Sequence, residues 1–210
     1  MPRLYLVRHG RAAATFAEHA DPGLDDLGRQ QAEVVAARLA PLGALALLSS
    51  PLARAKETAA PLQSRWRQPL RIDHRLAEIP SDTSDLLGRA AWLGSIMGGR
   101  VSDLAAPLQA WCAQVGECLL ELQEDTVIFS HFIAINIAVG IALGDDRLIT
   151  FRPDNASVTI IESFSIIESF SIIESSSIIE SSSSIESFSK GAARALRLIE
   201  RGHEAASTVN

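Results

Sequence analysis

The chain has 210 residues, of which 47% are hydrophobic and 21% charged, so it can bury the core of one compact domain, and we expect a single domain over residues 1–210. A formal net charge of −6 argues against binding of nucleic acid or anionic lipid through a general basic field. Any anionic substrate must then be held by local cations.

The amino-terminal stretch MPRLYLVRHG lacks the longer apolar run and the small-residue cleavage site of a signal peptide, so we expect a cytoplasmic protein. Residues 127–144 contain no Lys, Arg, Asp or Glu, but they include Ser130, His131 and Asn136 and have acidic side chains on both sides. We interpret this segment as a buried strand and helix, and we expect no membrane partner.

Cys112 and Cys118 lie six residues apart in a segment with a helical pattern. That spacing separates them by about 9 Å along a helix axis, which is too far for a disulfide within the helix. Two cysteines at this spacing also give no zinc motif, and they suit a reducing compartment.

The amino-terminal third predicts a strand, a helix and a second strand. An apolar run at 4–7 predicts a strand that ends in the triplet RHG at 8–10. Asp25 or Asp26 is suited to cap the following helix. This helix should bury an apolar stripe at helical spacing, formed by Val34, Val35, Leu39 and Leu42. A second strand is expected at 44–48.

The sequence SSP at 49–51 predicts where the second helix begins. Ser50 is suited to be its N-cap and Pro51 its first helical residue. The helix should continue through at least residue 60, with Pro61 kinking or ending it because proline lacks a backbone N–H.

The rest of the chain predicts further strands and helices. They are a short strand at 70–72, a mainly helical block at 80–125, a strand at 126–129, a buried helix at 132–143 and a strand at 157–161. The block at 80–125 is interrupted by Gly98-Gly99, and we interpret it as a helical cover inserted within the domain. Alternating strands and helices predict an α/β fold, a three-layer α/β/α sandwich with a largely parallel central sheet.

Residues 160–189 form a repeat unlike anything else in the chain. Its six-residue unit recurs five times as IIESFS, IIESFS, IIESSS, IIESSS and SIESFS. An even period keeps each position on one side of a strand, whereas six residues turn a helix by about 240°, so an ordered form would be extended. If one unit is kept, the sequence predicts an ordinary hairpin. We interpret the segment as a duplicated hairpin loop or an error in the recorded sequence and assign it no function.

Polar side chains follow three of the predicted strands. Arg8-His9, Arg54 and His131 all come shortly after a strand, and ligands of parallel sheets bind at the carboxyl ends of strands. A guanidinium in the first turn of a helix can bind two phosphate oxygens. Glu78 follows the third strand and could supply a proton, a role for which Asp82 and Asp85 are alternatives.

The sequence at these positions resembles the histidine phosphatase superfamily, also called the phosphoglycerate-mutase-like family. The resemblance covers nearly the whole chain outside the 80–125 block and the repeat, in the family's order and spacing. The segments that carry it are LYLVRHG at 4–10, LDDLGRQQA at 24–32, SSPLARAKETA at 49–59, LAEI at 76–79, VIFSH at 127–131 and NASVT at 155–159.

This resemblance implies that His9 is the nucleophile, that Arg8, Arg54 and His131 bind the phosphoryl group, and that Glu78 is the general acid. Such a site works without metal or cofactor, since phosphoryl transfer asks mainly for positioning and neutralisation of the oxygens. A phosphatase of protein phosphohistidine is one variant, but the 80–125 cover predicts a walled pocket suited to a small phosphorylated substrate, with inorganic phosphate as the product.

The sequence departs from the family pattern at two positions. Phe132 stands where the family usually has glycine, which predicts a narrower pocket or an aromatic wall. Thr15 stands where the family often has asparagine, and we expect it to donate to phosphate. Among the other candidates, we expect His19, His74 and His203 to be surface residues, and Arg11, Arg89, Arg100 and Arg152 to be solvated or paired unless one of them binds a second anionic group.

Hydrolysis of a phosphomonoester through a phosphohistidine intermediate is the leading hypothesis. A mutase that returns the phosphoryl group to substrate is the first alternative, but the segment RAAATFAEHADPG does not resemble the longer, more polar one of cofactor-dependent mutases. A phosphate-binding or regulatory protein that has lost turnover is the second alternative. Neither the substrate nor the oligomeric state can be deduced from the sequence.

Overall fold

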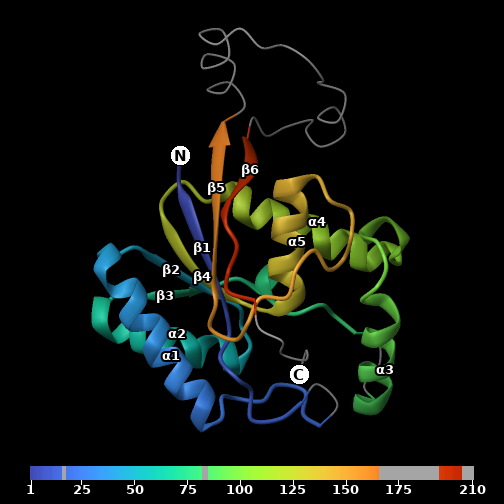
Figure 1. Cartoon of the computed structure of the whole chain (residues 1–210), viewed down its shortest axis with the longest axis horizontal. Helices are drawn as coiled ribbons and strands as arrows, with labels where there is room; N and C mark the ends of the chain where they lie inside the picture. Colours follow the sequence, from blue (N-terminus) through green and yellow to red (C-terminus); the bar gives the residue numbers. More distant parts are fainter. Residues whose placement is uncertain (16–17, 82–84, 166–193, 205–210) are drawn as a thin grey trace, which may run out of the picture.

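The structure, a computed structural model, describes residues 1–15, 18–81, 85–165 and 194–204. Strands and α-helices alternate through most of the chain, as predicted (Figure 1). In chain order they are β1 (Arg3–Arg8), α1 (Asp26–Leu39), β2 (Ala46–Ser49), α2 (Ala53–Trp66), β3 (Leu70–Ile72), α3 (Leu86–Ile96), α4 (Ala106–Glu121), β4 (Thr126–Ser130), α5 (Phe132–Leu143), β5 (Val158–Ser165) and β6 (Arg194–Glu200).

The strands form one mixed sheet in the order β3-β2-β4-β1-β5-β6. Strands β1 to β4 pair in parallel, whereas β5 and β6 pair antiparallel to their neighbours. The register sets Arg8 of β1 opposite Ser130 of β4, and Ser49 of β2 opposite Phe129 of β4. The carboxyl ends of three strands therefore meet at one edge, and this edge carries the candidate site.

Helices cover both faces of the sheet, which confirms the predicted α/β sandwich (Figure 1). Helices α1 and α2 pack on one face, where Val7, Val35 and Leu62 belong to one buried cluster. Helices α4 and α5 pack on the other face in a larger cluster that includes Trp111 and Ile133. The block at 80–125 was predicted to be a cover. Its helix α4 belongs to one layer of the sandwich, whereas its helix α3 lies beside the sandwich (Figure 1).

Helix α1 is capped as predicted but buries a narrower stripe than expected. The Asp25 side chain accepts a hydrogen bond from the backbone N–H of Gly28 at 2.7 Å. Val35 and Leu39 are buried, but Val34 is 70% exposed and Leu42 is 42% exposed. The prediction was wrong for these two because α1 ends at Leu39 and turns Val34 away from the sheet.

Helix α2 begins later than predicted. Its N-cap is Leu52 and its first residue is Ala53, so Ser50 is not the N-cap and Pro51 is not in the helix. Pro61 lies inside α2 without ending it, and the helix continues to Trp66. Proline removes one backbone N–H, which the packing of α2 against α1 and the sheet outweighs.

Strands β5 and β6 pair antiparallel from Ser165 opposite Arg194 to Ile160 opposite Glu200. Residues 160–165 of the repeat belong to β5. The predictions for the remainder of the repeat, from residue 166 onward, lie outside the described residues.

Cys112 and Cys118 are both buried free thiols. Burial raises the pKa of each thiol to about 12.

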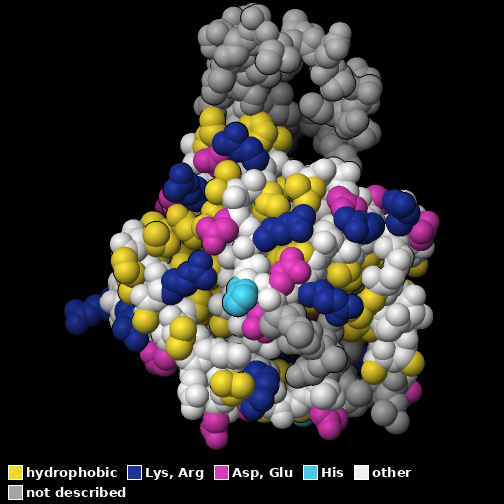
Figure 2. Space-filling model, in the orientation of Figure 1, with side chains coloured by type: hydrophobic (Ala, Val, Ile, Leu, Met, Phe, Trp, Pro, Cys, Tyr) yellow, Lys and Arg dark blue, Asp and Glu magenta, His cyan; other side chains and the backbone are white. Residues whose placement is uncertain are grey.

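Over the described ranges, no helix is both long and apolar enough to span a membrane. On the face drawn in Figure 2, Lys and Arg side chains are interspersed with Asp and Glu rather than gathered into one basic patch.

A close backbone contact fixes the turn after β1 against the start of α1. A Cβ atom on Gly28 would lie 2.1 Å from the carbonyl oxygen of Arg11, and a Cβ on Gly10 would lie 2.5 Å from the carbonyl oxygen of Gly28. Any side chain at either position would push the turn, and with it the end of β1, away from α1.

We expect Gly28→Ala to lower the free energy of unfolding by about 1–3 kcal/mol, because the added methyl group overlaps backbone that cannot rotate away. Urea denaturation measures the change. Gly94→Ala is the matched control: no atom lies within 4 Å of the added Cβ in α3, so it should stabilise the protein by about 0.5–1 kcal/mol. Equal effects of the two substitutions would contradict the proposed contact.

Candidate active site

The structure brings four of the predicted site residues together at the carboxyl edge of the sheet. Arg8 ends β1 and His9 follows it, Arg54 lies in the first turn of α2, and His131 stands between β4 and α5. All four side chains are at most 5% exposed. Buried charged and polar groups of this kind need partners, so their contacts define what the site can do.

His9 is held in one tautomer by its own turn. Its Nδ1 lies 2.7 Å from the carbonyl oxygen of Gly10, and a carbonyl can only accept, so Nδ1 carries the proton. The other ring nitrogen, Nε2, accepts a hydrogen bond from Nε of Arg54 at 3.2 Å. The unprotonated Nε2 is therefore next to a cation. This arrangement suits a nucleophile that attacks an anion, because the lone pair is available and the cation attracts the anion.

Both histidines are held neutral. Burial, together with the charges of Arg54 and Arg8, places the pKa of His9 well below its ordinary value of 6.5. Burial and Arg54 lower the pKa of His131 in the same way. The two rings lie 5.1 Å apart between centroids. A neutral imidazole retains the lone pair that nucleophilic attack requires.

His131 bonds to a serine that sequence reasoning assigned to another role. Its Nε2 lies 2.7 Å from Oγ of Ser50, and Ser50 also accepts the N–H of Leu52 at 3.2 Å. Nδ1 of His131 is buried and forms no hydrogen bond with any described residue. The motif SSP could have indicated Ser50, but its partner lies 81 residues away in the sequence.

Arg8 is buried against backbone and an aromatic ring. Its Nη1 donates to the carbonyl oxygen of Pro153 at 2.8 Å, and its Cζ lies 5.1 Å from the centre of the Phe132 ring. Burial lowers the pKa of Arg8, and the charges of Glu78 and Asp154 oppose that shift. Phe132 itself is 2% exposed, and its ring packs against the guanidinium of Arg8.

Arg54 faces a carboxylate that sequence reasoning missed. Oδ1 of Asp21 accepts the backbone N–H of Ala53 at 2.8 Å and lies 3.8 Å from Nη1 of Arg54. Asp21 comes from the segment between β1 and α1, where no sequence motif indicates it. This carboxylate adds negative charge beside a guanidinium predicted to bind phosphate.

Glu78 is partly buried within the field of the two arginines. Its Oε1 accepts the backbone N–H groups of Ile79 at 3.0 Å and Ile133 at 3.2 Å. Burial raises the pKa of Glu78 above 4.5, while these hydrogen bonds and the charges of Arg54 and Arg8 act in the opposite direction. A carboxyl group that holds its proton to higher pH is suited to be a general acid.

The remaining candidates are not drawn into this cluster. Thr15 is exposed and its hydroxyl donates to Glu18 at 2.9 Å. Asp85 is exposed and accepts the N–H of Gly88, whereas Asp82 lies outside the described residues. His19, His74 and His203 are exposed, as predicted.

The four additional arginines divide into two groups. The exposed ones are Arg11, which pairs with Asp25, Arg100, which pairs with Asp146, and Arg152. Arg89 of α3 is partly buried. Burial lowers the pKa of Arg54, and the positive charge of Arg89 lowers it further. Arg89 is thus the arginine of this set whose field reaches the cluster. In the described part of the chain, no three His, Cys, Asp or Glu side chains lie together as metal ligands.

Comparison with known proteins agrees with this geometry. Residues 4–92, which contain His9, Arg54 and Glu78, match the family model of the histidine phosphatase superfamily, branch 1. The matched segment is less than half of the chain.

One curated relative of the chain is a phosphatase. The glucosyl-3-phosphoglycerate phosphatase of Mycolicibacterium vanbaalenii is 42% identical over 80 residues, which cover 36% of this chain and 36% of the relative. The match thus spans about a third of the length of that curated relative.

Solved structures share the fold. A native mycobacterial glucosyl-3-phosphoglycerate phosphatase superposes with a TM-score of 0.65 at 20% identity, over 98% of this chain and 100% of that chain. The phosphoserine phosphatase of Entamoeba histolytica, in complex with 3-phosphoglyceric acid, gives a TM-score of 0.61 at 21% identity, over 77% and 91% of the two chains. These likenesses show that the chain has a phosphoglycerate-mutase-like fold.

The neutral histidines predict a dependence of stability on pH. Because the folded state holds His9 and His131 unprotonated, only the unfolded chain takes up their protons below pH 6.5. The free energy of unfolding should therefore fall as the pH is lowered from 7 to 5, by roughly 1 kcal/mol per pH unit on average for each histidine. Urea denaturation at each pH measures this.

Glu78 acts in the opposite direction over the same range, since its raised pKa makes the folded state bind a proton at a pH where the unfolded state has lost it. Removing this contribution with Glu78→Gln should make the decline steeper. If the free energy of unfolding of this variant falls no more steeply with decreasing pH than that of the native protein, the raised pKa of Glu78 is contradicted.

The negative charge of Asp21 should lower the affinity of the site for anions. Asp21→Asn keeps an oxygen acceptor for Ala53 and removes the negative charge near Arg54, so inorganic phosphate or vanadate should bind about two- to tenfold more tightly. Titration calorimetry at low salt measures this. Asp26→Asn, at a side chain 93% exposed, is the matched control and should leave the Kd unchanged. An unchanged Kd in Asp21→Asn would show that Asp21 does not oppose anion binding.

Proposed function

We propose that this chain is a phosphomonoester hydrolase that acts on a small phosphorylated metabolite through a phosphohistidine intermediate at His9. The observation that carries the proposal is the state of His9. Its Nδ1–H bonds to the Gly10 carbonyl at 2.7 Å, while its unprotonated Nε2 lies next to the Arg54 guanidinium. This is what in-line attack on a phosphoryl group requires.

In the first step, Nε2 of His9 attacks phosphorus, and the bond between phosphorus and the substrate oxygen breaks. The electron pair of that bond leaves with the oxygen, and protonated Glu78 supplies the proton that makes it an alcohol. Burial supports this role because it raises the pKa of Glu78. The products of the step are a phosphohistidine, a free alcohol and an ionised Glu78.

In the second step, water attacks the phosphohistidine. Glu78, now a carboxylate, accepts a proton from the attacking water, and the bond between nitrogen and phosphorus breaks. The electron pair returns to Nε2 of His9, and inorganic phosphate leaves. The enzyme ends with a neutral His9 and a protonated Glu78, ready for another cycle.

Charge neutralisation in both steps falls to the buried cations. Arg8 and Arg54 supply two guanidinium groups at the edge of the sheet, and the low local dielectric strengthens their attraction for phosphoryl oxygens. His131 supplies a further polar contact beside His9. These groups support a mechanism that needs no metal ion.

The names of the relatives support a small phosphorylated substrate. One relative is a glucosyl-3-phosphoglycerate phosphatase, and a protein of the same fold is a phosphoserine phosphatase. Both substrates are phosphomonoesters of small metabolites.

Hydrolysis of para-nitrophenyl phosphate in the presence of EDTA tests the proposal. We expect metal-independent turnover by the native protein, acid-labile phosphate on the protein, and a loss of at least about a thousandfold in kcat in His9→Ala. His74→Ala is the matched control, since its side chain is exposed and outside the cluster.

The other outcomes separate the alternatives. Turnover that persists in His9→Ala contradicts the phosphohistidine mechanism. Vanadate binding without turnover favours a phosphate-binding protein, and return of the labelled phosphate to an added alcohol or phosphoglycerate favours a mutase.

A further inference from the structure

Thr58 lies between the two residues that the proposed reaction relies on most. It stands one helical turn after Arg54 in α2 and is fully buried. Its hydroxyl donates to the carbonyl oxygen of Arg54 at 2.6 Å and accepts the backbone N–H of Gly10 at 2.9 Å. One hydroxyl thus joins the helix that carries Arg54 to the turn that orients His9.

These contacts close a ring. The N–H of Gly10 donates to the Thr58 hydroxyl, and the carbonyl oxygen of Gly10 accepts a hydrogen bond from Nδ1–H of His9. The Nε2 atom of the same imidazole accepts a hydrogen bond from Nε of Arg54, and the Arg54 carbonyl leads back to Thr58. The tautomer of His9 and its distance from Arg54 are therefore set by one connected group of bonds.

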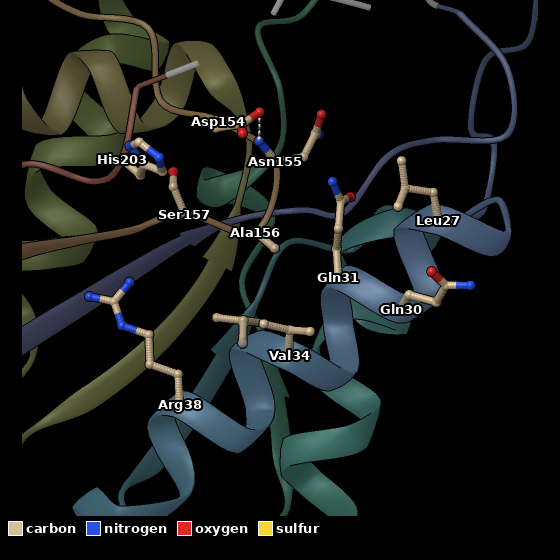
Figure 3. A pocket seen from close by; sticks show the side chains of 11 residues that line it. Leu27, Gln30, Gln31, Val34, Arg38, Asp154, Asn155, Ala156, Ser157 and His203 are labelled. Atoms are coloured by element: carbon tan, nitrogen blue, oxygen red, sulfur yellow. Dashed lines mark hydrogen bonds between the residues drawn. The ribbon is translucent and has the colours of Figure 1, made fainter.

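Other elements hold the same turn from outside this ring. Nδ2 of Asn155 donates to the carbonyl oxygen of His9 at 3.0 Å, and Oε1 of Gln31 accepts the N–H of Arg11 at 2.8 Å. Both side chains line a hollow of about 320 Å³ between α1 and residues 154–157 (Figure 3). They fix the turn against α1 and the loop before β5, whereas Thr58 fixes it against the helix of Arg54.

We propose that Thr58 is a positioning residue that keeps the Nε2 atom of His9 unprotonated and aligned with Arg54. This rests on the proposed phosphatase function, because the alignment matters only if His9 is the nucleophile. Without the hydroxyl, the Gly10 N–H is buried without its acceptor, and the turn shifts to find another. The carbonyl that selects the His9 tautomer then moves with it.

A threonine hydroxyl often bonds to the carbonyl four residues earlier in a helix, and such a bond by itself indicates only local structure. The contact with Gly10, which is 48 residues away in the sequence, separates Thr58 from that ordinary case. A merely structural threonine would change stability and leave the chemical step alone.

Three variants of the full-length chain test the inference. Thr58→Val keeps the shape and removes the hydroxyl, and Thr58→Ser keeps the hydroxyl. Thr126→Val is the matched control, since Thr126 is a buried threonine at the start of β4 whose hydroxyl also donates to a backbone carbonyl, that of Glu124 at 2.8 Å. Thr58→Ala is made as well, in case the valine variant does not fold.

We expect kcat and the rate of phosphoenzyme formation to fall about 10- to 100-fold in Thr58→Val, as small displacements of reacting groups do, with KM changed less than about threefold. Thr58→Ser should retain activity within about threefold. Thr126→Val should lose thermal stability as Thr58→Val does, but keep the native kcat. Unchanged kcat in a folded Thr58→Val or Thr58→Ala, or equal losses in Thr126→Val, would overturn the proposal.

A second measurement does not depend on turnover. The ¹⁵N chemical shifts of the His9 ring report which nitrogen carries the proton. We expect the Nδ1–H form in the native protein and in Thr58→Ser, and a mixture of tautomers in Thr58→Val. An unchanged tautomer in Thr58→Val would overturn the proposal, whereas an inactive native protein with the expected shifts would show that only the proposed function had failed.

Discussion

The burial of two guanidinium groups at one edge of the sheet is the constraint on which the site depends. Arg8 and Arg54 are at most 5% exposed, and burial lowers the pKa of each. Buried like charges are costly unless other groups compensate them. The carbonyl of Pro153 beside Arg8 and the carboxylate of Asp21 beside Arg54 do so here. A bound phosphoryl group, as the proposed function requires, would add to that compensation.

The same two cations set the state of the groups around them. Their field and burial keep His9 and His131 neutral, so the lone pair needed for attack is present near neutral pH. Burial raises the pKa of Glu78 even though the arginines oppose the shift. The site therefore combines two histidines whose pKa values are lowered with a carboxyl group whose pKa is raised, and burial is the first cause of each shift.

Much of this could be predicted from the sequence, because the polar motifs directly follow apolar strands. The parallel sheet then had to bring the ends of β1, β2 and β4 together, and Arg8, His9, Arg54 and His131 lie where that reasoning placed them. The predictions for Ser50, Val34 and Leu42 were wrong, since local patterns do not show which neighbour a side chain meets. Ser50 bonds to His131 instead of capping α2, and Val34 turns to solvent.

The sequence by itself determined the order of strands and helices and the residue types at each strand end, because hydrophobic periodicity and short motifs are local properties. Only the tertiary structure decided how those residues are held. Thr58 reaches Gly10 across 48 residues of sequence, Arg54 reaches His9 across 45, and Phe132 lies beneath Arg8. Such contacts depend on how the helices dock on the sheet, and no spacing along the chain encodes a hydrogen bond between segments so far apart.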